Sequence, residues 1–348
     1  MGVPVRLRAF AFLALAACGN ADAPREPKAN ALAASKAAEV PDTAGVMAEL
    51  RRIASESGGT VGVAAIHVET GQRLALNARQ PYPMASTFKL PLGLAILARV
   101  DSGRISLDDS LDVTPADFRL PPNPIVDSVG PAGGRATVRA LLRSMLVDSD
   151  NAAADRLLRV VGGPAVATEH LRSRGIQGIR IDRSEGQVSW DYNGVNDVPP
   201  PAQWSLAEFE RRTSAVAASE REAARARFWA DPRDTAAPEA FAALLVQVQK
   251  GEGLSAESRR LVLDAMERSP RGRNRIRAGV PEGTTVGDRT GTIGRSTNDI
   301  GLITLPDGSH VALAVMVKMS TRTTEDEERT IARVARAVYD HFARQAKS

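Results

Sequence analysis

The stretch NDIGLITLPDGSHVALAVMV, residues 298–317, contains two apolar runs joined through Pro306-Asp307-Gly308. Apolar runs on either side of a short turn with proline and glycine predict a β-hairpin. A second hairpin is predicted at 60–76, TVGVAAIHVETGQRLAL. Nearly all of the sequence between these two hairpins has a helical pattern. We therefore expect an α/β (α+β) fold, with an antiparallel sheet built from both chain ends, flanking helices and an inserted all-helical lobe.

Several helices have recognisable ends or faces. The run TVRALLRSML begins at Thr137, an N-cap candidate, and ADRLLRVVGG stops at a glycine pair. The C-terminal stretch 323–345 carries four acidic residues in its first turn, which favour the positive end of a helix dipole. Its apolar residues predict one buried face, made of Ile331, Val334, Ala335, Val338 and Phe342.

The composition excludes some partners and cofactors. The chain has 348 residues and a net charge of +4. Its basic residues are scattered along helical patterns, so nucleic acid is not an expected partner. With four histidines and one cysteine, a zinc site has almost no ligands, and no cofactor is expected. We expect a monomer.

The N-terminus has the form of a secretory signal, with Arg6 and Arg8 before the apolar run from Ala9 to Ala17. Cys18 follows Leu-Ala-Ala, which resembles the lipobox of bacterial lipoproteins. We expect a signal peptide at 1–17, a lipid on Cys18, a flexible tether at 18–44 and a single catalytic domain at 45–348. The protein would then be exported to the cell envelope or periplasm. The alternative is ordinary cleavage nearby, with Cys18 lost or free.

A serine and a lysine lie three residues apart in PMASTFKLPL, residues 83–92. On a helix, Ser86 and Lys89 share a face. A lysine in an apolar setting can act as the base for a serine nucleophile, because burial disfavours its charged form. The alternative is a helix start at which Ser86 is a cap and Lys89 is solvated. None of the four histidines lies in a triad context, which disfavours a Ser-His-Asp hydrolase.

Two further segments could complete a site. Ser149-Asp150-Asn151 lies between two helical runs, where a loop would present a hydroxyl and an amide; the alternative is a helix cap. Arg289-Thr290-Gly291-Thr292 ends a strand-like run and combines a cation, a hydroxyl and a glycine, which suit an anionic substrate. The alternative interpretation of this segment is an exposed edge strand with a turn.

In this order, the three segments resemble the Ser-x-x-Lys, Ser-Asp-Asn and Lys-Thr-Gly motifs of class A serine β-lactamases and penicillin-binding proteins. The resemblance covers about residues 45–345. It implies a β-lactamase/DD-peptidase-like fold with a sheet lobe at about 45–85 and 280–345 and a helical lobe at about 86–279.

Other stretches resemble the class A branch in particular. RIDRSEGQVS, residues 180–189, resembles the start of the class A Ω-loop and puts Glu185 at the place of the deacylating carboxylate. Arg183 and Asp234 match the ion pair that closes this loop, which would span about 183–234. Arg275 stands where some class A enzymes hold a second carboxylate-binding arginine.

The resemblance implies a mechanism. Ser86 would attack the lactam carbonyl and become acylated, with Lys89, or Glu185 acting through a water, as the base. Ser149 would relay a proton to the leaving nitrogen, and Glu185 would activate the deacylating water. The backbone N–H groups of Ser86 and Thr292 would hold the oxyanion. The residues implied to bind substrate are Asn151, Arg275, Arg289, Thr290, Gly291 and Thr292.

The sequence departs from the family pattern in the Ω-loop and nearby. Arg289 replaces the usual lysine, Ser189 an asparagine and Gly186 a proline; we expect Gly186 to loosen the loop. About 35 extra residues separate Trp190 from Asp231. This insertion carries Ser205-Leu206-Ala207-Glu208, a capping-box pattern, and helical text. It predicts a helix-bearing lid beside the site, or else a surface decoration.

Three functions are consistent with these features. The leading one is a serine β-lactamase that turns over a β-lactam substrate. A penicillin-binding DD-peptidase or related esterase would be acylated once by penicillin and would release the acyl group slowly. A non-catalytic lipoprotein that binds muropeptides would form no adduct.

Overall fold

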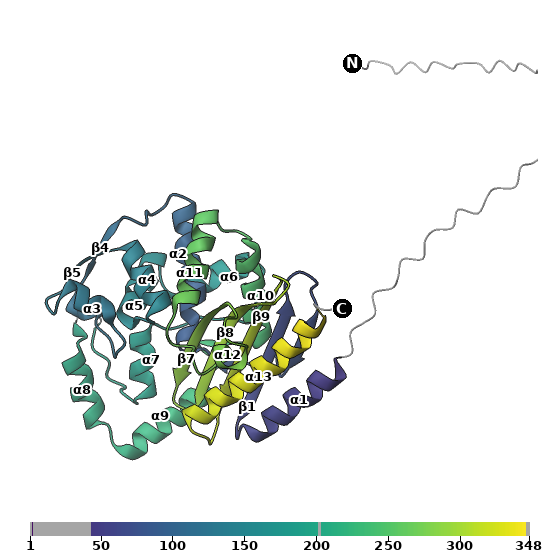
Figure 1. The fold of residues 1–348 in the computed structure, drawn as a ribbon. Helices are drawn as coiled ribbons and strands as arrows, with labels where there is room; N and C mark the ends of the chain where they lie inside the picture. Colours follow the sequence, from purple (N-terminus) through teal and green to yellow (C-terminus); the bar gives the residue numbers. More distant parts are fainter. Residues whose placement is uncertain (1, 3–42, 201–202, 346–348) are drawn as a thin grey trace, which may run out of the picture. The chain divides into compact units, whose positions relative to one another are not determined.

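The computed structural model describes residue 2, residues 43–200 and residues 203–345. The chain divides into the units Met1–Pro41 and Asp42–Ser348, and the second is described here (Figure 1). The expected signal peptide, Cys18 and nearly all of the tether lie outside the described residues. Within the described part, no helix is both long and apolar enough to cross a membrane.

A five-stranded antiparallel sheet is built from both ends of the folded unit, which confirms the predicted fold class. Its strand order is β2-β1-β9-β8-β7. Both predicted hairpins form, as β1–β2 and β8–β9. The strands are β1 (Thr60–His67), β2 (Arg73–Leu76), β7 (Val286–Ile293), β8 (Ser296–Thr304) and β9 (His310–Lys318).

Helices cover both faces of this sheet, because its inner strands are apolar on both sides. Along β9, Leu313 and Val315 face one hydrophobic core, whereas Ala314 and Met316 face the other. Alternate side chains of a strand point to opposite faces, so β9 is buried on both. On the first face lie α1 (Ala44–Glu56) and α13 (Thr324–Gln345), which appear purple and yellow in Figure 1. The predicted apolar face of α13 is buried, as expected.

The other face packs against α10 (Pro238–Lys250), beyond which lies the mostly helical lobe. Thr137 caps α4 as predicted, since its side chain accepts a hydrogen bond from the Ala140 N–H at 3.1 Å. Helix α5 ends at Gly162 with φ 96°, a left-handed conformation suited to glycine. The lobe contains α2 (Lys89–Asp101), α3 (Pro124–Val129), α4 (Val138–Val147), α5 (Asn151–Val161), α6 (Pro164–Ser173) and α11 (Ala256–Arg268).

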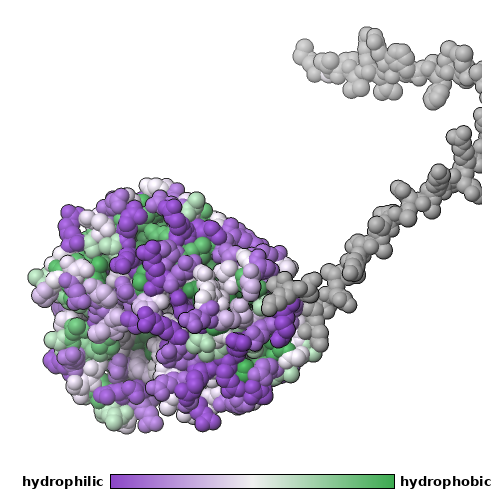
Figure 2. Space-filling model, in the orientation of Figure 1, coloured by the Kyte–Doolittle hydropathy of each residue, from purple (hydrophilic) through white to green (hydrophobic). Residues whose placement is uncertain are grey.

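Short elements connect and complete the two lobes. The pairs β3–β6 and β4–β5 form two small ribbons. Their bounds are β3 (Tyr82–Pro83), β4 (Ser110–Val113), β5 (Gly134–Thr137) and β6 (Thr235–Ala236). The remaining helices are η1 (Ala85–Phe88), η2 (Pro115–Asp117), α7 (Glu185–Tyr192), α8 (Leu206–Ala215), α9 (Ala218–Ala230) and α12 (Ile276–Gly279). The face of the molecule in Figure 2 is mainly hydrophilic, with scattered apolar residues.

Candidate active site

A cavity of about 440 Å³ lies where β7, the start of the helical lobe and the Ω-loop meet. Sequence analysis predicted many of the residues that line it. Lys89 and Arg289 are not among these lining residues, because both are fully buried behind the cavity wall. The predicted residues that line it are Ser86, Ser149, Asn151, Arg183, Glu185, Asp234, Arg275, Thr290, Gly291 and Thr292.

Ser86 lies in η1, a short 3₁₀ turn between β3 and α2. The preceding residue, Ala85, has φ 46°, an unusual conformation for a residue with a side chain. Strand β7 passes very close to this turn at Gly291, where an added Cβ would lie 2.5 Å from the Met84 carbonyl oxygen and 3.1 Å from the Ser86 nitrogen. Glycine is therefore needed at 291 for the strand to approach the serine.

The amine of Lys89 connects most of the predicted catalytic groups. Its Nζ donates to Ser86 Oγ at 3.0 Å and to the Ser149 carbonyl oxygen at 2.9 Å, and it also contacts Asn151 Oδ1. Glu185 Oε1 lies 3.1 Å from the same nitrogen. Lys89 is 0 % exposed, so the alternative of a solvated lysine is wrong.

Burial lowers the pKa of Lys89 to about 8, although the nearby Glu185 carboxylate acts in the opposite direction. Removing an ammonium from water penalises its charged form, and this penalty outweighs the single ion pair. A neutral amine is therefore accessible near physiological pH, within reach of the Ser86 hydroxyl. Such a group can serve as a general base.

The Ser149-Asp150-Asn151 segment serves both as a cap and as a site wall. Asp150 is the N-cap of α5 and accepts from the Ala153 N–H at 2.8 Å. Its neighbours face Lys89: Ser149 through its carbonyl and hydroxyl, Asn151 through its side-chain oxygen. Ser149 has φ 66°, which turns the chain between α4 and α5. The helix cap that was considered as the alternative is therefore formed by Asp150. The side chains of Ser149 and Asn151 on either side of it remain at the site.

Arg289 joins the two lobes behind the cavity. It is 1 % exposed and donates to the Ser86 carbonyl oxygen at 3.0 Å, the Leu146 carbonyl oxygen at 3.2 Å and Ser149 Oγ at 2.7 Å. Burial, together with the neighbouring Arg271 cation, lowers its pKa to about 10. The structure therefore does not bring this guanidinium to the cavity surface, where a direct contact with substrate was expected.

Arg275 lies at the cavity surface, held by β7, β8 and α13. Its Nη2 donates to Thr292 Oγ1 at 2.8 Å, and its Nε donates to Glu328 Oε1 at 3.0 Å. Two of the charged lining residues, Arg271 and Glu328, were not predicted. The run RGRNR did contain Arg271, but the resemblance pointed only to Arg275. Glu328 was interpreted as a residue that favours the helix dipole, and nothing in its spacing indicated a place at the site.

Glu185 is the first residue of α7, where a carboxylate is favoured by the helix dipole. Ser184 and Gln187 form a capping box before it. The backbone N–H groups of Glu185 and Gly186 donate to the two oxygens of Asp155, at 2.7 and 3.0 Å. Asp155 is 1 % exposed and was not predicted. Asp155 lies one turn into α5. Glu185, whose N–H donates to it, is 30 residues further along the chain, so no local pattern indicates this contact.

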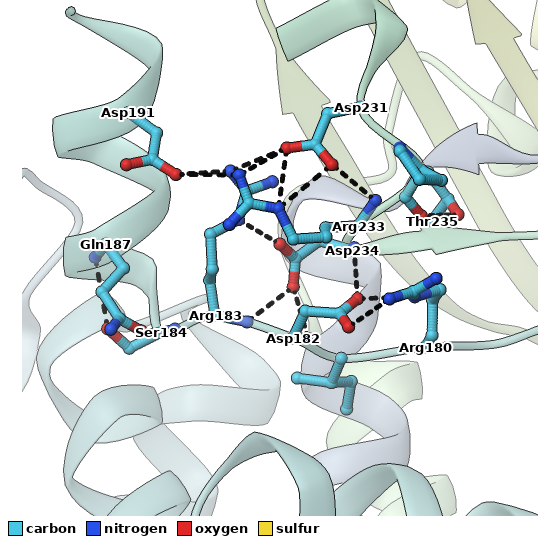
Figure 3. Close-up of polar contacts among 12 residues, drawn as sticks. Arg180, Asp182, Arg183, Ser184, Gln187, Asp191, Asp231, Arg233, Asp234 and Thr235 are labelled. Carbon is cyan, nitrogen blue, oxygen red and sulfur yellow. Dashed lines mark hydrogen bonds and ion pairs between the residues drawn. The ribbon is translucent and has the colours of Figure 1, made fainter.

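The expected pair of Arg183 and Asp234 forms, with Nε and Oδ2 2.5 Å apart (Figure 3). Arg183 also contacts Asp191 Oδ2 at 2.6 Å and Asp231 Oδ2 at 3.3 Å. Asp191 and Asp231 stand at the two ends of the insertion. One buried guanidinium therefore holds both the Ω-loop and the base of the inserted helices.

The insertion folds as α8 and α9, and α9 packs against α7 (Figure 1). Half of the predicted capping box forms at α8: Ser205 accepts from the Glu208 N–H at 3.1 Å, whereas the Glu208 carboxylate pairs with Arg211 and Arg212. Phe228 of α9 lines the cavity, and so does Val188 of α7, whereas Ser189 is not among the lining residues. Among the residues that the structure describes, no group of three or more histidine, cysteine or acidic side chains could hold a metal ion.

Comparisons with known proteins agree with this geometry. The model of the β-lactamase enzyme family matches residues 45–342. β-Lactamase VEB-1 of Pseudomonas aeruginosa is 26 % identical over 84 % of this chain and 89 % of its own. β-Lactamase L2 of Stenotrophomonas maltophilia is 30 % identical, covering 80 % of each chain. The structure of an ancestral class A β-lactamase aligns with TM-score 0.70 and 33 % identity over 85 % of this chain and 99 % of that one.

The chain therefore belongs to the β-lactamase enzyme family, and the resemblance found in its motifs is confirmed. Within this family it is a serine β-lactamase of class A, a hydrolase with the fold of the class A structures.

Proposed function

We propose that this protein hydrolyses the β-lactam amide through an acyl intermediate on Ser86, which water activated by Glu185 then releases. The observation that carries the proposal is the position of the Lys89 amine. It lies 3.0 Å from Ser86 Oγ and 3.1 Å from Glu185 Oε1, so one buried nitrogen links the nucleophile to the carboxylate.

In the acylation step, Ser86 Oγ attacks the lactam carbonyl carbon and loses its proton to neutral Lys89. The carbon–nitrogen bond then breaks, and the proton passes through Ser149 to the leaving nitrogen. The contact between Lys89 and the Ser149 hydroxyl, at 3.4 Å, supports this route. The N–H groups of Ser86 and Thr292 would stabilise the oxyanion, at a loss of about 10²–10³ in rate for each donor removed.

The substrate would lie between Asn151 and the basic end of the cavity. Arg271, Arg275, Thr290 and Thr292 line that end. Arg289 is committed to Ser86, Leu146 and Ser149, so we assign it the task of joining the two lobes rather than gripping the substrate. The cation and hydroxyl groups at the cavity surface suit the carboxylate that β-lactam antibiotics carry.

Deacylation distinguishes a hydrolase from a protein that stays acylated. Glu185 lines the cavity, and its side chain is 17 % exposed, so it can reach both Lys89 and a water. As a general base it would aim that water at the ester carbon on Ser86.

Intact-mass spectrometry after exposure to penicillin tests the proposal. Wild-type protein should yield penicilloic acid and return to the free mass, Ser86→Ala should never be acylated, and Glu185→Gln should keep the adduct. A lasting adduct on wild-type protein would instead indicate a DD-peptidase-like activity, and no adduct would indicate a binding protein. If Glu185→Gln deacylated as fast as wild type, the role given to Glu185 would be wrong.

We also propose that the protein is exported and held at the membrane by a lipid on Cys18, and that it acts as a monomer. The support for the anchor is the signal-like stretch that ends in Leu-Ala-Ala-Cys. Labelled palmitate should be incorporated into the full chain during expression and not into Cys18→Ala. Equal labelling of both would contradict the anchor.

A further inference from the structure

We infer that Trp204, in the insertion, is a positioning residue for Glu185: its indole occupies the space that a side chain at 186 would take, and it covers the ion pair that holds the first turn of α7. This inference rests on the proposed role of Glu185 in deacylation.

The indole lies directly on Gly186. A Cβ added at 186 would lie 2.1 Å from Trp204 Cζ3 and 2.8 Å from Cε3, so no residue with a side chain fits beside this tryptophan. Trp204 is 7 % exposed, and its Nε1 donates to the Pro199 carbonyl oxygen at 2.5 Å. Gly186 was expected to loosen the loop, yet it is buried under an aromatic ring that comes from the insertion.

A short chain of contacts leads from the indole to Glu185. The guanidinium of Arg119 lies over the Trp204 ring, 4.7 Å from its centroid. Arg119 Nε donates to Asp155 Oδ2 at 2.6 Å, and Asp155 accepts from the N–H groups of Glu185 and Gly186. Arg119 and Asp155 are 6 % and 1 % exposed. By excluding water, the indole strengthens this pair and the backbone hydrogen bonds that depend on it.

The insertion has its own small core, which holds Trp204 in place. Its ring stands edge-on to Trp190, with centroids 6.1 Å apart, and the tilted ring of Phe209 has its centroid 4.7 Å from that of Trp190. We call Trp190, Val195, Trp204 and the adjoining Val198, Phe209 and Val216 the insertion cluster. Because Trp190 belongs to α7, the helix that presents Glu185 is also the base of this cluster.

The expected effect is selective for deacylation. A water-activating carboxylate must stand within hydrogen-bond reach of its water, and a displacement of about 1 Å costs about 10²-fold in rate. Acylation depends on Ser86 and Lys89, which belong to η1 and α2 and not to the insertion. We expect Trp204→Ala to slow deacylation about 10- to 100-fold and to change acylation less than about 3-fold.

The test compares Trp204→Ala with Phe209→Ala in the full-length protein, using rapid-quench intact-mass spectrometry with penicillin. Both variants truncate the insertion cluster, but the Phe209 ring contacts Trp190, whereas the Trp204 ring lies on Gly186. The acyl-enzyme should accumulate in Trp204→Ala, remain near the wild-type fraction in Phe209→Ala, and fall back toward it in Trp204→Phe. Equal accumulation in the two alanine variants, or none in Trp204→Ala, would overturn the inference.

A second variant keeps the tryptophan, so the test does not depend on how Trp204→Ala folds. Gly186→Ala should displace the indole and raise the acyl-enzyme fraction in the wild-type background. Its effect should be smaller in the Trp204→Ala background, where, of the three atoms nearest to the added Cβ, only Arg119 Nε at 2.9 Å remains. Additive effects would mean that the two residues act independently, which contradicts the inference. Glu185→Gln is measured alongside: if it fails to accumulate adduct, it is the proposed role of Glu185 that fails, whatever the Trp204 variants do.

Discussion

Lys89 holds the site together at the level of single residues. Its amine contacts Ser86, Ser149, Asn151 and Glu185 while the rest of the side chain is sealed in the helical lobe. A cation in such a place loses its hydration, which is why its pKa falls to about 8 despite the adjacent carboxylate. The residue can therefore exchange a proton with the serine on one side and with the carboxylate on the other.

With Lys89 as the proposed base, this pKa should make the acylation step dependent on pH. Only the neutral amine can accept a proton, so the acylation rate constant should rise with pH and level off above about pH 8. The Glu185 carboxylate raises the pKa of Lys89, so removing its charge should move the rise to lower pH. Rapid-quench mass spectrometry of wild type and Glu185→Gln between pH 6 and pH 10 measures both profiles.

The same measurement separates the two candidate bases. With Lys89 as the base, Glu185→Gln keeps rapid acylation with a shifted profile. If acylation in Glu185→Gln fell by more than about 100-fold and lost its rise with pH, the base would be Glu185 acting through a water.

At the scale of elements, the Ω-loop and its insertion share one anchor. Arg183 is 5 % exposed and contacts Asp191, Asp231 and Asp234, which come from the start and the end of the inserted segment. Breaking a buried ion pair by removing one partner is costly, because it leaves the other charges uncompensated. Without this guanidinium Asp234 would lose its ion pair, and Asp191 and Asp231 would keep only the more exposed Arg233, at 3.4 and 2.6 Å.

Arg183→Ala should therefore release the insertion before the rest of the protein unfolds. We expect thermolysin to cleave between residues 191 and 230 at least about 10-fold faster than in wild type, since local opening governs such cleavage. Arg225→Ala is the matched control, because Arg225 is an exposed arginine of α9 that stacks on Tyr192. Equal cleavage rates for the two variants would show that Arg183 does not anchor the segment.

Two hydrophobic cores on either side of one sheet organise the whole molecule. Strand β9 lies at the centre of the sheet, paired with β1 from the start of the folded unit and β8 from its end. A defect in β9 therefore affects both lobes, and unfolding of the domain should be cooperative.

Leu313→Ala tests this cooperativity. Leu313 is 0 % exposed, and its truncation should lower the free energy of unfolding by about 2–5 kcal/mol through lost burial and a residual cavity. Val166→Ala, at a site that is 40 % exposed, should change it by less than about 0.5 kcal/mol. Urea unfolding followed by circular dichroism and by loss of nitrocefin hydrolysis should give coincident transitions in both variants. Separate transitions would contradict a single cooperative unit.

The elements that could be predicted are those whose signals are local. The two hairpins, the cap at Thr137 and the buried face of α13 each depend on residues close together in the chain. The order of the serine-lysine, Ser-Asp-Asn and Arg-Thr-Gly segments was likewise visible, and these segments meet at one cavity.

Most contacts between distant segments could not be predicted; the pair of Arg183 and Asp234 is an exception, because the family resemblance implied it. Arg119 and Asp155 are 36 residues apart, and neither has a neighbour in the sequence that marks it as a partner of Glu185. Arg289 carries the charge expected of a substrate-binding cation, but it is buried, and its guanidinium donates to Ser86, Leu146 and Ser149. Gly186 and the insertion are two separate departures in the sequence, and only the folded chain places Trp204 of the insertion on the glycine.

The amino-acid sequence alone determined the secondary-structure pattern, the family and most of the reactive groups, because periodicity, caps and motif spacing are properties of neighbouring residues. The tertiary structure alone decided which charges are buried, and with them the pKa of Lys89, the hydrogen bonds of Arg289 and the packing of Trp204 on Gly186. Desolvation and packing depend on which distant segments meet, and no local pattern records that.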